Sequence, residues 1–215
     1  TTEIYTLSLH DALPIFGRPH FHVPLQSGSD SVLKAMRRRY TTAAYRQRVE
    51  RAVSIIPECA LGVDVIVGYP GEGRDEFREM FAFIETLPAA YLHVFTCSVR
   101  PGTLLASQSV SGERTGVERQ EIERRSRLLV ELGKSKKAAF VSRFIGREFG
   151  ILVEESFLDS EGNLRCRGYS ANYLHVTATA AKGMTRDGKT LRGKVVPVRP
   201  VGMNDDLNLE GILLF

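Results

Sequence analysis

The turn after an apolar segment, Leu61–Gly68, contains residue types that suit ligand binding. Gly68 and Gly71 allow the backbone to turn tightly and to approach a ligand closely, while Pro70 fixes the turn. Glu72 stands where a helix is expected to begin, and the helix dipole favours a carboxylate there. The same spacing also occurs in ordinary strand–helix loops. The segment therefore indicates a cofactor site without requiring one.

A second turn with polar side chains follows the predicted strand His20–Leu25. Gln26, Ser27 and Ser29 offer amide and hydroxyl groups that could hydrogen-bond a polar cofactor, although the serines could equally cap a helix that begins at Asp30. If both strands belong to one parallel barrel, the two turns share its carboxyl-terminal face, which is where ligands bind.

Residues 165–199 contain eight basic residues and one acidic residue, a local net charge of +7. Such an excess favours a polyanionic partner, and the interleaved aromatic rings could stack on bases. A merely solvated charged face is the alternative interpretation. The residues that we predict to contact RNA are Arg165, Arg167, Tyr173, Lys182, Arg192 and Lys194.

Two other groups of residues could bind metal, and neither pattern supports it. His20 and His22 share a face of the predicted strand, but no carboxylate or cysteine nearby completes a ligand set, so we favour core histidines. Cys59, Cys97 and Cys166 are far apart and odd in number, which argues against both a disulfide framework and a metal site built from cysteines alone. We therefore predict no metal ligands.

The composition is that of an ordinary globular protein of 215 residues, with 43% hydrophobic residues and a net charge of +4. No apolar run is long enough to span a bilayer. We expect a cytoplasmic, reduced, monomeric protein. Residues 1–16 fail as a signal peptide and are interpreted as a non-native leader, with a poorly packed natural leader as the alternative.

Hydrophobic periodicity predicts two domains. In residues 17–145, strands alternate with amphipathic helices, which indicates a parallel α/β arrangement of barrel or open-sheet type. In residues 146–215, five short β-like runs indicate a small all-β barrel, a fold often used for nucleic acid. The predicted strands are 20–25, 61–68, 91–96, 149–155, 164–168, 173–181, 191–199 and 207–214; the predicted helices are 30–36, 42–56, 74–87 and 115–144.

Three motifs in this order resemble the radical S-adenosylmethionine (SAM) tRNA methylthiotransferases: HFHVPLQSGSDSVLKAMRRRYT, GVDVIVGYPGE and LHVFTCSVRPGT. The tail, with GYSANYLHV, is similar to the RNA-binding TRAM barrel of that family. The first motif, together with LHVFT in the third, most resembles the branch that acts on threonylcarbamoyladenosine (t6A).

The resemblance implies a C-terminal fragment of an enzyme that transfers a methylthio group to C2 of t6A at position 37 of tRNA. Its fold would be part of a radical-SAM barrel followed by a TRAM domain. The family uses SAM and two [4Fe–4S] clusters, whose cysteine ligands are absent from this chain, so we expect this chain alone to be inactive. By motif position, the SAM pocket is lined by Gln26, Ser27, Ser29, Gly68 and Glu72, with Arg100 on the same face toward the substrate.

Three alternatives remain open at this point. The enzyme could act on isopentenyladenosine (i6A) in tRNA or on ribosomal protein S12. The chain could also be an RNA-binding protein without catalytic activity. One local departure from the family pattern is Gly73, which replaces the usual Thr after PGE and remains an acceptable helix N-cap.

Overall fold

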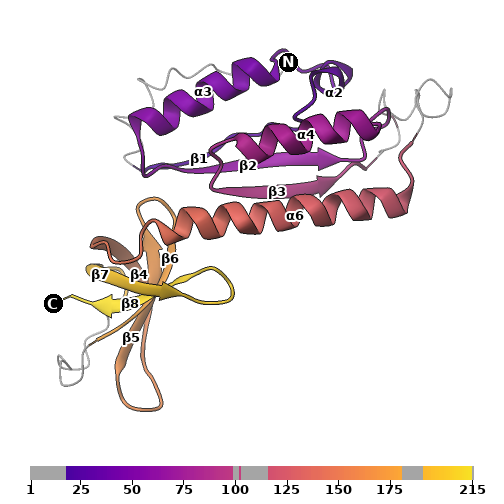
Figure 1. The fold of residues 1–215 in the computed structure, drawn as a ribbon. Helices are drawn as coiled ribbons and strands as arrows, with labels where there is room; N and C mark the ends of the chain where they lie inside the picture. The colour runs from indigo at the N-terminus through magenta and orange to yellow at the C-terminus, as the bar shows by residue number, and fades with distance from the viewer. Residues whose placement is uncertain (1–17, 99–101, 103–115, 181–190, 215) are drawn as a thin grey trace. The chain divides into compact units, whose positions relative to one another are not determined.

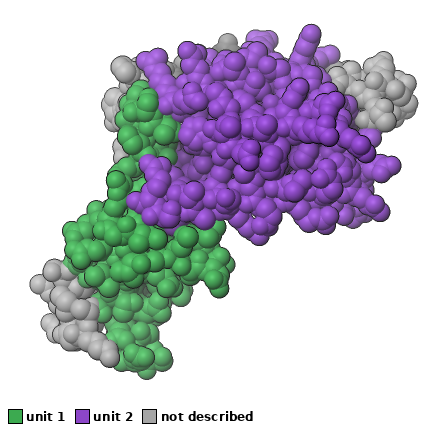
Figure 2. All heavy atoms as spheres, in the orientation of Figure 1, with its two compact units in different colours: residues 1–20, 52–59, 144–215 green, residues 21–51, 60–143 purple. Residues whose placement is uncertain are grey.

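A computed structural model describes residues 18–98, 102, 116–180 and 191–214. The predicted leader, Arg100 and Lys182 therefore lie outside the described residues. The chain divides into two compact units, which Figure 2 colours separately and which are described one at a time below. One unit comprises residues 21–51 and 60–143, and the other residues 1–20, 52–59 and 144–215.

The first unit contains a three-stranded sheet in the order β1-β2-β3 (Figure 1). Strands β2 and β3 are parallel, and Asp64 lies opposite His93 in their register. A parallel bridge between Gln26 and Val65 continues the pairing beyond the end of β1. The elements that lie wholly or mostly in this unit are β1 (His20–His22), α2 (Asp30–Ala35), α3 (Thr42–Ile55), β2 (Ala60–Val67), α4 (Arg74–Thr86), β3 (Tyr91–Thr96) and α6 (Arg119–Ser142).

The core of this unit lies on one face of the sheet. Leu61, Val63, Val65 and Val67 alternate along β2 and pack with apolar side chains of α3, α4 and α6. The residues between them point to the opposite face, where Asp64 is only partly buried. The nearly continuous apolar sequence of the predicted strand 61–68 favours burial on both faces, but the helices of the described chain cover one face, so Asp64 and Ile66 are only partly buried.

The second unit contains a closed five-stranded barrel in the order β4-β5-β6-β8-β7, which confirms the predicted small β-barrel. Adjacent strands are antiparallel except for β6 and β8, which are parallel. Inward-facing side chains such as Ile151, Cys166, Val176 and Val198 are fully buried and form its core. The strands are β4 (Phe149–Leu158), β5 (Leu164–Ser170), β6 (His175–Thr179), β7 (Val195–Met203) and β8 (Leu209–Leu213).

Several predicted boundaries were wrong, two of them because a turn intrudes. The strand predicted from residue 191 begins at Val195, after a turn in which Gly193 has φ +77°. The strand predicted from residue 173 begins at His175, because Tyr173 has φ +66°. Helix α6 begins at Arg119 rather than near residue 115. Within the described part of the chain, no helix combines the length and apolarity needed to cross a membrane.

Candidate functional site

A pocket of about 450 Å³ lies where the three parallel strands end. That volume is within the range of small-molecule sites, and the carboxyl ends of parallel strands are where ligands bind in α/β folds. The wall combines apolar and aromatic groups with a few polar ones. Its lining residues are Gln26, Met36, Arg38, Asp64, Ile66, Tyr69, Phe95, Thr96, Cys97 and Ser98.

Gln26 is the predicted cofactor residue that lines this pocket. Its backbone has φ +71°, a strained conformation for a residue other than glycine. Two hydrogen bonds hold it there: its N–H donates to the Asp64 carbonyl at 2.8 Å, and its carbonyl accepts from the Ile66 N–H at 2.8 Å. The strand pairing thus fixes the Gln26 side chain at the pocket wall.

Ser27 and Ser29 follow Gln26 but are buried beneath the turn. The Ser29 N–H donates to Ser27 Oγ at 3.2 Å, and Ser29 Oγ donates to a carboxylate oxygen of Glu79 on α4. Ser29 occupies the N-cap position of α2 without a capping bond from its side chain. Both hydroxyls therefore hold the loop in place.

The second predicted turn is fixed by Gly68 and Glu72. Gly68 has φ +79°, and a Cβ there would lie 2.6 Å from Ile122 of α6, so only glycine suits the position. Its N–H donates to Glu72 Oε1 at 3.2 Å, and Arg125 Nη1 lies 2.7 Å from the same oxygen. Burial raises the pKa of the Glu72 carboxyl, and the hydrogen bonds from Arg125 and Gly68 oppose that rise.

Arg125 is the functional neighbour that sequence reasoning missed. Its guanidinium also donates to the Glu72 carbonyl at 3.0 Å, so a buried ion pair ties the turn after β2 to α6. A buried carboxylate requires a cation or hydrogen-bond donors, so the expected position of Glu72 could have prompted a search for a cationic partner. The sequence offers many arginines, however, and nothing in it selects Arg125.

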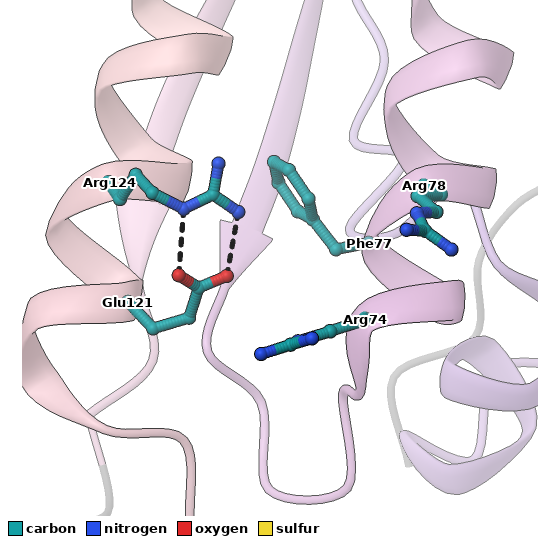
Figure 3. A pocket seen from close by; sticks show the side chains of 5 residues that line it. All are labelled: Arg74, Phe77, Arg78, Glu121 and Arg124. Atoms are coloured by element: carbon teal, nitrogen blue, oxygen red, sulfur yellow. Dashed lines mark hydrogen bonds and ion pairs between the residues drawn. The ribbon is translucent and has the colours of Figure 1, made fainter.

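A second, smaller pocket of about 330 Å³ lies between α4 and α6 (Figure 3). Glu121 accepts two hydrogen bonds from Arg124, at 2.7 and 2.8 Å, and Arg74 and Arg78 approach from α4. Phe77 completes the lining. Arg124 is paired with Glu121, and Arg78 Nη1 lies 3.1 Å from Asp75 Oδ1, so two of the three lining arginines already have a carboxylate partner.

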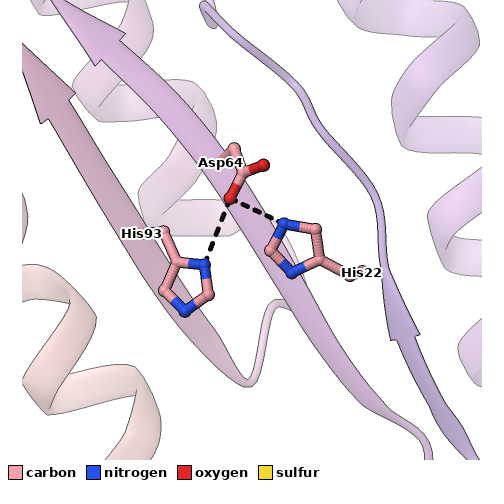
Figure 4. A group of neighbouring side chains, drawn as sticks. All are labelled: His22, Asp64 and His93. Carbon is pink, nitrogen blue, oxygen red and sulfur yellow. Dashed lines mark hydrogen bonds and ion pairs between the residues drawn. The ribbon is translucent and has the colours of Figure 1, made fainter.

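On the sheet face opposite the core, His22, Asp64 and His93 form a row across the three strands (Figure 4). His22 Nε2 lies 2.7 Å and His93 Nδ1 3.2 Å from the same oxygen, Asp64 Oδ1. The prediction of a core histidine was therefore wrong for His22, whose side chain is 37% exposed. The carboxylate that completes the group is Asp64 of β2, which is too far from His22 in the sequence for the local pattern to indicate it.

The outer face of β5 combines cations with aromatic rings. Arg165, Arg167 and Tyr169 alternate with buried residues and so share this face. The Arg167 guanidinium lies 4.9 Å from the centroid of the Phe157 ring. Tyr173, 62% exposed, stacks on Tyr169 at 4.7 Å between ring centroids.

Arg192 and Lys194 are exposed, but they lie in the turn before β7 rather than on a strand. The Val153 N–H donates to the Lys194 carbonyl, and the Gly193 N–H donates to the Val153 carbonyl, so the turn is bonded to β4. Because β4 also pairs with β5, the two cations and the β5 face flank the same strand. Their spacing of two residues in the predicted strand 191–199 would place both side chains on one strand face, and the turn contradicts that expectation.

The three cysteines are free, with Cys59 and Cys166 buried and Cys97 partly exposed. In the described ranges, the one group of three metal-ligating side chains is the His22 row, which contains no cysteine. An iron–sulfur cluster needs several thiolates close together. The residues present therefore do not fit such a cluster.

Comparisons with known proteins agree with the sequence motifs. The radical SAM superfamily matches residues 9–84. The threonylcarbamoyladenosine tRNA methylthiotransferase MtaB of Bacillus subtilis is 34% identical over 177 residues, which are 82% of this chain and 38% of that protein. The tRNA-2-methylthio-N(6)-dimethylallyladenosine synthase of Thermobifida fusca is 39% identical over 137 residues, 64% of this chain and 27% of that protein.

A second synthase of the latter name, from Chloroflexus aurantiacus, is 32% identical over 195 residues, 91% of this chain and 39% of that protein. The match thus extends over both described units. The chain spans about two fifths or less of the length of these relatives.

Proposed function

We propose that this chain, a member of the radical SAM tRNA methylthiotransferase family, is part of an enzyme that adds a methylthio group to C2 of t6A at position 37 of tRNA. The observation that carries the proposal is the pairing, in one chain, of a ligand pocket at the strand ends with a barrel that presents cations and aromatic rings. The t6A branch rests on the first sequence motif and on LHVFT in the third, since relatives of both adenosine branches match the chain.

In this proposal, the pocket at the strand ends binds SAM, which would supply the methyl group. Gln26 would contact it directly, and Tyr69 and Phe95 offer aromatic faces for its adenine. Gly68 would allow close approach of the backbone, while Ser27, Ser29 and Glu72 hold the two turns in position. Arg100 stays a predicted substrate contact.

Cluster ligation has no basis in this chain, because its three cysteines are separate. Both [4Fe–4S] clusters would need ligands from outside these residues, and the chain by itself would be inactive. We also propose that the barrel is a TRAM domain that binds tRNA through Arg165, Arg167, Tyr173, Lys182, Arg192 and Lys194. A monomeric, cytoplasmic enzyme is consistent with this role.

Mass spectrometry of tRNA nucleosides from a strain that lacks the complete gene tests the proposal. We expect the 2-methylthio form of t6A to disappear while that of i6A persists. Loss of the i6A product instead would assign the enzyme to that branch, and loss of a methylthio group from ribosomal protein S12 to the third. No change in any product would favour the RNA-binding protein without catalytic activity.

Complementation with variants tests the pocket. Gln26→Ala in the complete gene should restore less of the modified nucleoside than the wild-type gene does. Glu123→Gln, on the exposed face of α6, is the matched control and should restore it fully. Equal restoration by both variants would remove Gln26 from the cofactor site.

A further inference from the structure

The row of His22, Asp64 and His93 has the composition of a metal site. Asp64 also lines the pocket at the strand ends, but none of the SAM contacts proposed above involves these three side chains. Each residue comes from a different strand of the sheet, and their ligand atoms all lie within 4.8 Å of one another. We propose that these three side chains bind one divalent transition-metal ion, with Zn²⁺ as the reference ion.

The distances suit such an ion. Ligands bound to zinc at about 2.0–2.1 Å in a tetrahedron are about 3.3 Å apart. The His93 Nδ1–Asp64 Oδ1 distance of 3.2 Å is already close to that value, whereas the His22 Nε2–Asp64 Oδ1 distance of 2.7 Å would have to lengthen as an ion enters. Figure 4 shows both rings directing a nitrogen at the one carboxylate oxygen. Rotation of the two partly exposed rings would adjust the third edge.

The electrostatics of Asp64 favour a cation at this point. Its side chain is only 18% exposed, and within the described chain its ion-pair partners are the two histidines. A carboxylate that is largely removed from water is stabilised by a nearby cation. A divalent ion between the three groups would supply that charge.

The framework is rigid and one side is open. Asp64 and His93 are direct partners in the register of β2 and β3, which fixes their spacing. The side chains of His22 and His93 are 37% and 50% exposed, so the remaining coordination positions face outward from the sheet. Three protein ligands with an open position are typical of zinc sites that also hold water.

Metal titration of the whole 215-residue chain tests the proposal directly. Co²⁺ serves as a spectroscopic probe, followed by competition with Zn²⁺ measured by calorimetry. We expect one ion per chain and visible absorption bands of a low-coordinate Co²⁺ site. Asp64→Asn and His93→Ala should each weaken binding by more than about 100-fold, since loss of neighbours that merely orient ligands already weakens binding by 10–100-fold.

His20→Gln is the matched control, because it removes an imidazole from the same strand without touching the row. It should bind Co²⁺ as the wild type does. A thermal melt with and without Zn²⁺ gives a second readout, since an ion that binds the folded state raises Tm.

The proposal is overturned if Asp64→Asn and His93→Ala bind as tightly as the wild type, or if His20→Gln weakens binding equally. It is also overturned if no stoichiometric binding occurs and the row is a hydrogen-bonded cluster alone. These readouts do not involve tRNA modification, so the proposed function and the metal site fail independently.

Discussion

Arg125 and Glu72 form a buried ion pair across 53 residues of sequence, with 2.7 Å between Nη1 and Oε1. Their side chains are 3% and 0% exposed. The pair fixes the turn at the edge of the candidate cofactor pocket to the last helix of the first unit. Its removal should therefore affect both stability and ligand binding.

Arg125→Met should destabilise the fold by about 3–5 kcal/mol, because it leaves a buried carboxylate without a counter-charge. Arg119→Met is the matched control, since the Arg119 side chain is 92% exposed and pairs with Glu123 on the surface. We expect the control to lose less than about 1 kcal/mol. Urea unfolding followed by circular dichroism measures both, and similar losses in the two variants would contradict the prediction.

The Glu121 carboxylate should titrate at unusually low pH. Hydrogen bonds from Arg124 and Arg125 hold its pKa at about 2, below the ordinary 4.5. A carboxyl whose pKa is lower in the folded state stabilises the fold above pH 4.5 and loses that contribution as pH falls toward 2. NMR of the Glu121 side-chain carboxyl carbon should show the midpoint near 2.

The titration has an internal control. Arg124→Ala should move the Glu121 midpoint upward, toward 4.5, whereas Arg119→Ala, which does not contact Glu121, should leave it in place. A midpoint near 4.5 in the wild type would show that the two arginines do not bind Glu121 in solution.

Gly168→Ala should damage the barrel. A Cβ at Gly168 would lie 2.0 Å from the carbonyl oxygen of Leu152 on the neighbouring strand, so the β4–β5 pairing must shift. Forcing extra atoms into packed structure typically costs about 1–3 kcal/mol. Gly202→Ala, in β7, meets nothing within 4 Å and should change stability by less than about 0.5 kcal/mol. Thermal melts compare the two.

Binding of tRNA should weaken steeply with salt if the barrel cations contact phosphate. The double change Arg192→Ala plus Lys194→Ala should lower the affinity for tRNA. It should also flatten the slope of log affinity against log salt concentration by the amount of one or two phosphate contacts, about 0.7–0.9 per contact. Tyr173→Ala should lower affinity at unchanged slope, since a stacked ring carries no charge. Lys134→Ala, whose ammonium pairs with Glu131 on α6, is the control. Wild-type slope in the double variant would make these cations a solvated face.

Anaerobic reconstitution of the chain with iron and sulfide should yield no stoichiometric [4Fe–4S] cluster. Burial raises the pKa of the Cys166 thiol to about 11 and also raises that of Cys97. Cys59 and Cys166 are buried, so alkylation at pH 8 should label Cys97 first and the other two after unfolding. About one cluster per chain would contradict the interpretation of all three cysteines.

The order and type of the regular elements could be predicted, because apolar periodicity reports which residues face a core. The strand Tyr91–Thr96 has the predicted bounds, and β2 and α4 lie within a residue of theirs. The small barrel was also foreseeable, since short alternating runs between turn residues suit few other folds.

The composition of the site could not be predicted in the same way, because it depends on tertiary partners. The row of His22, Asp64 and His93 follows from the register of three strands, which no local pattern encodes. The positive φ of Gln26 likewise comes from its bonds to Asp64 and Ile66 rather than from its own preference. Arg125 could not be selected as the partner of Glu72, because the local sequence around it does not distinguish it from the other arginines of the chain.

The insertion of β8 between β6 and β7 has a consequence for synthesis on the ribosome. Strand Leu209–Leu213 closes the barrel by pairing with both β6 and β7. The β6–β8 and β7–β8 pairings therefore cannot be complete before residue 213 has left the exit tunnel. Until then, β6 and β7 each expose a strand edge, and a nascent chain in that state is a substrate for chaperones and prone to aggregation. A nonsense mutation before Leu209 should therefore prevent the folded barrel from accumulating, instead of yielding a stable barrel that lacks one strand.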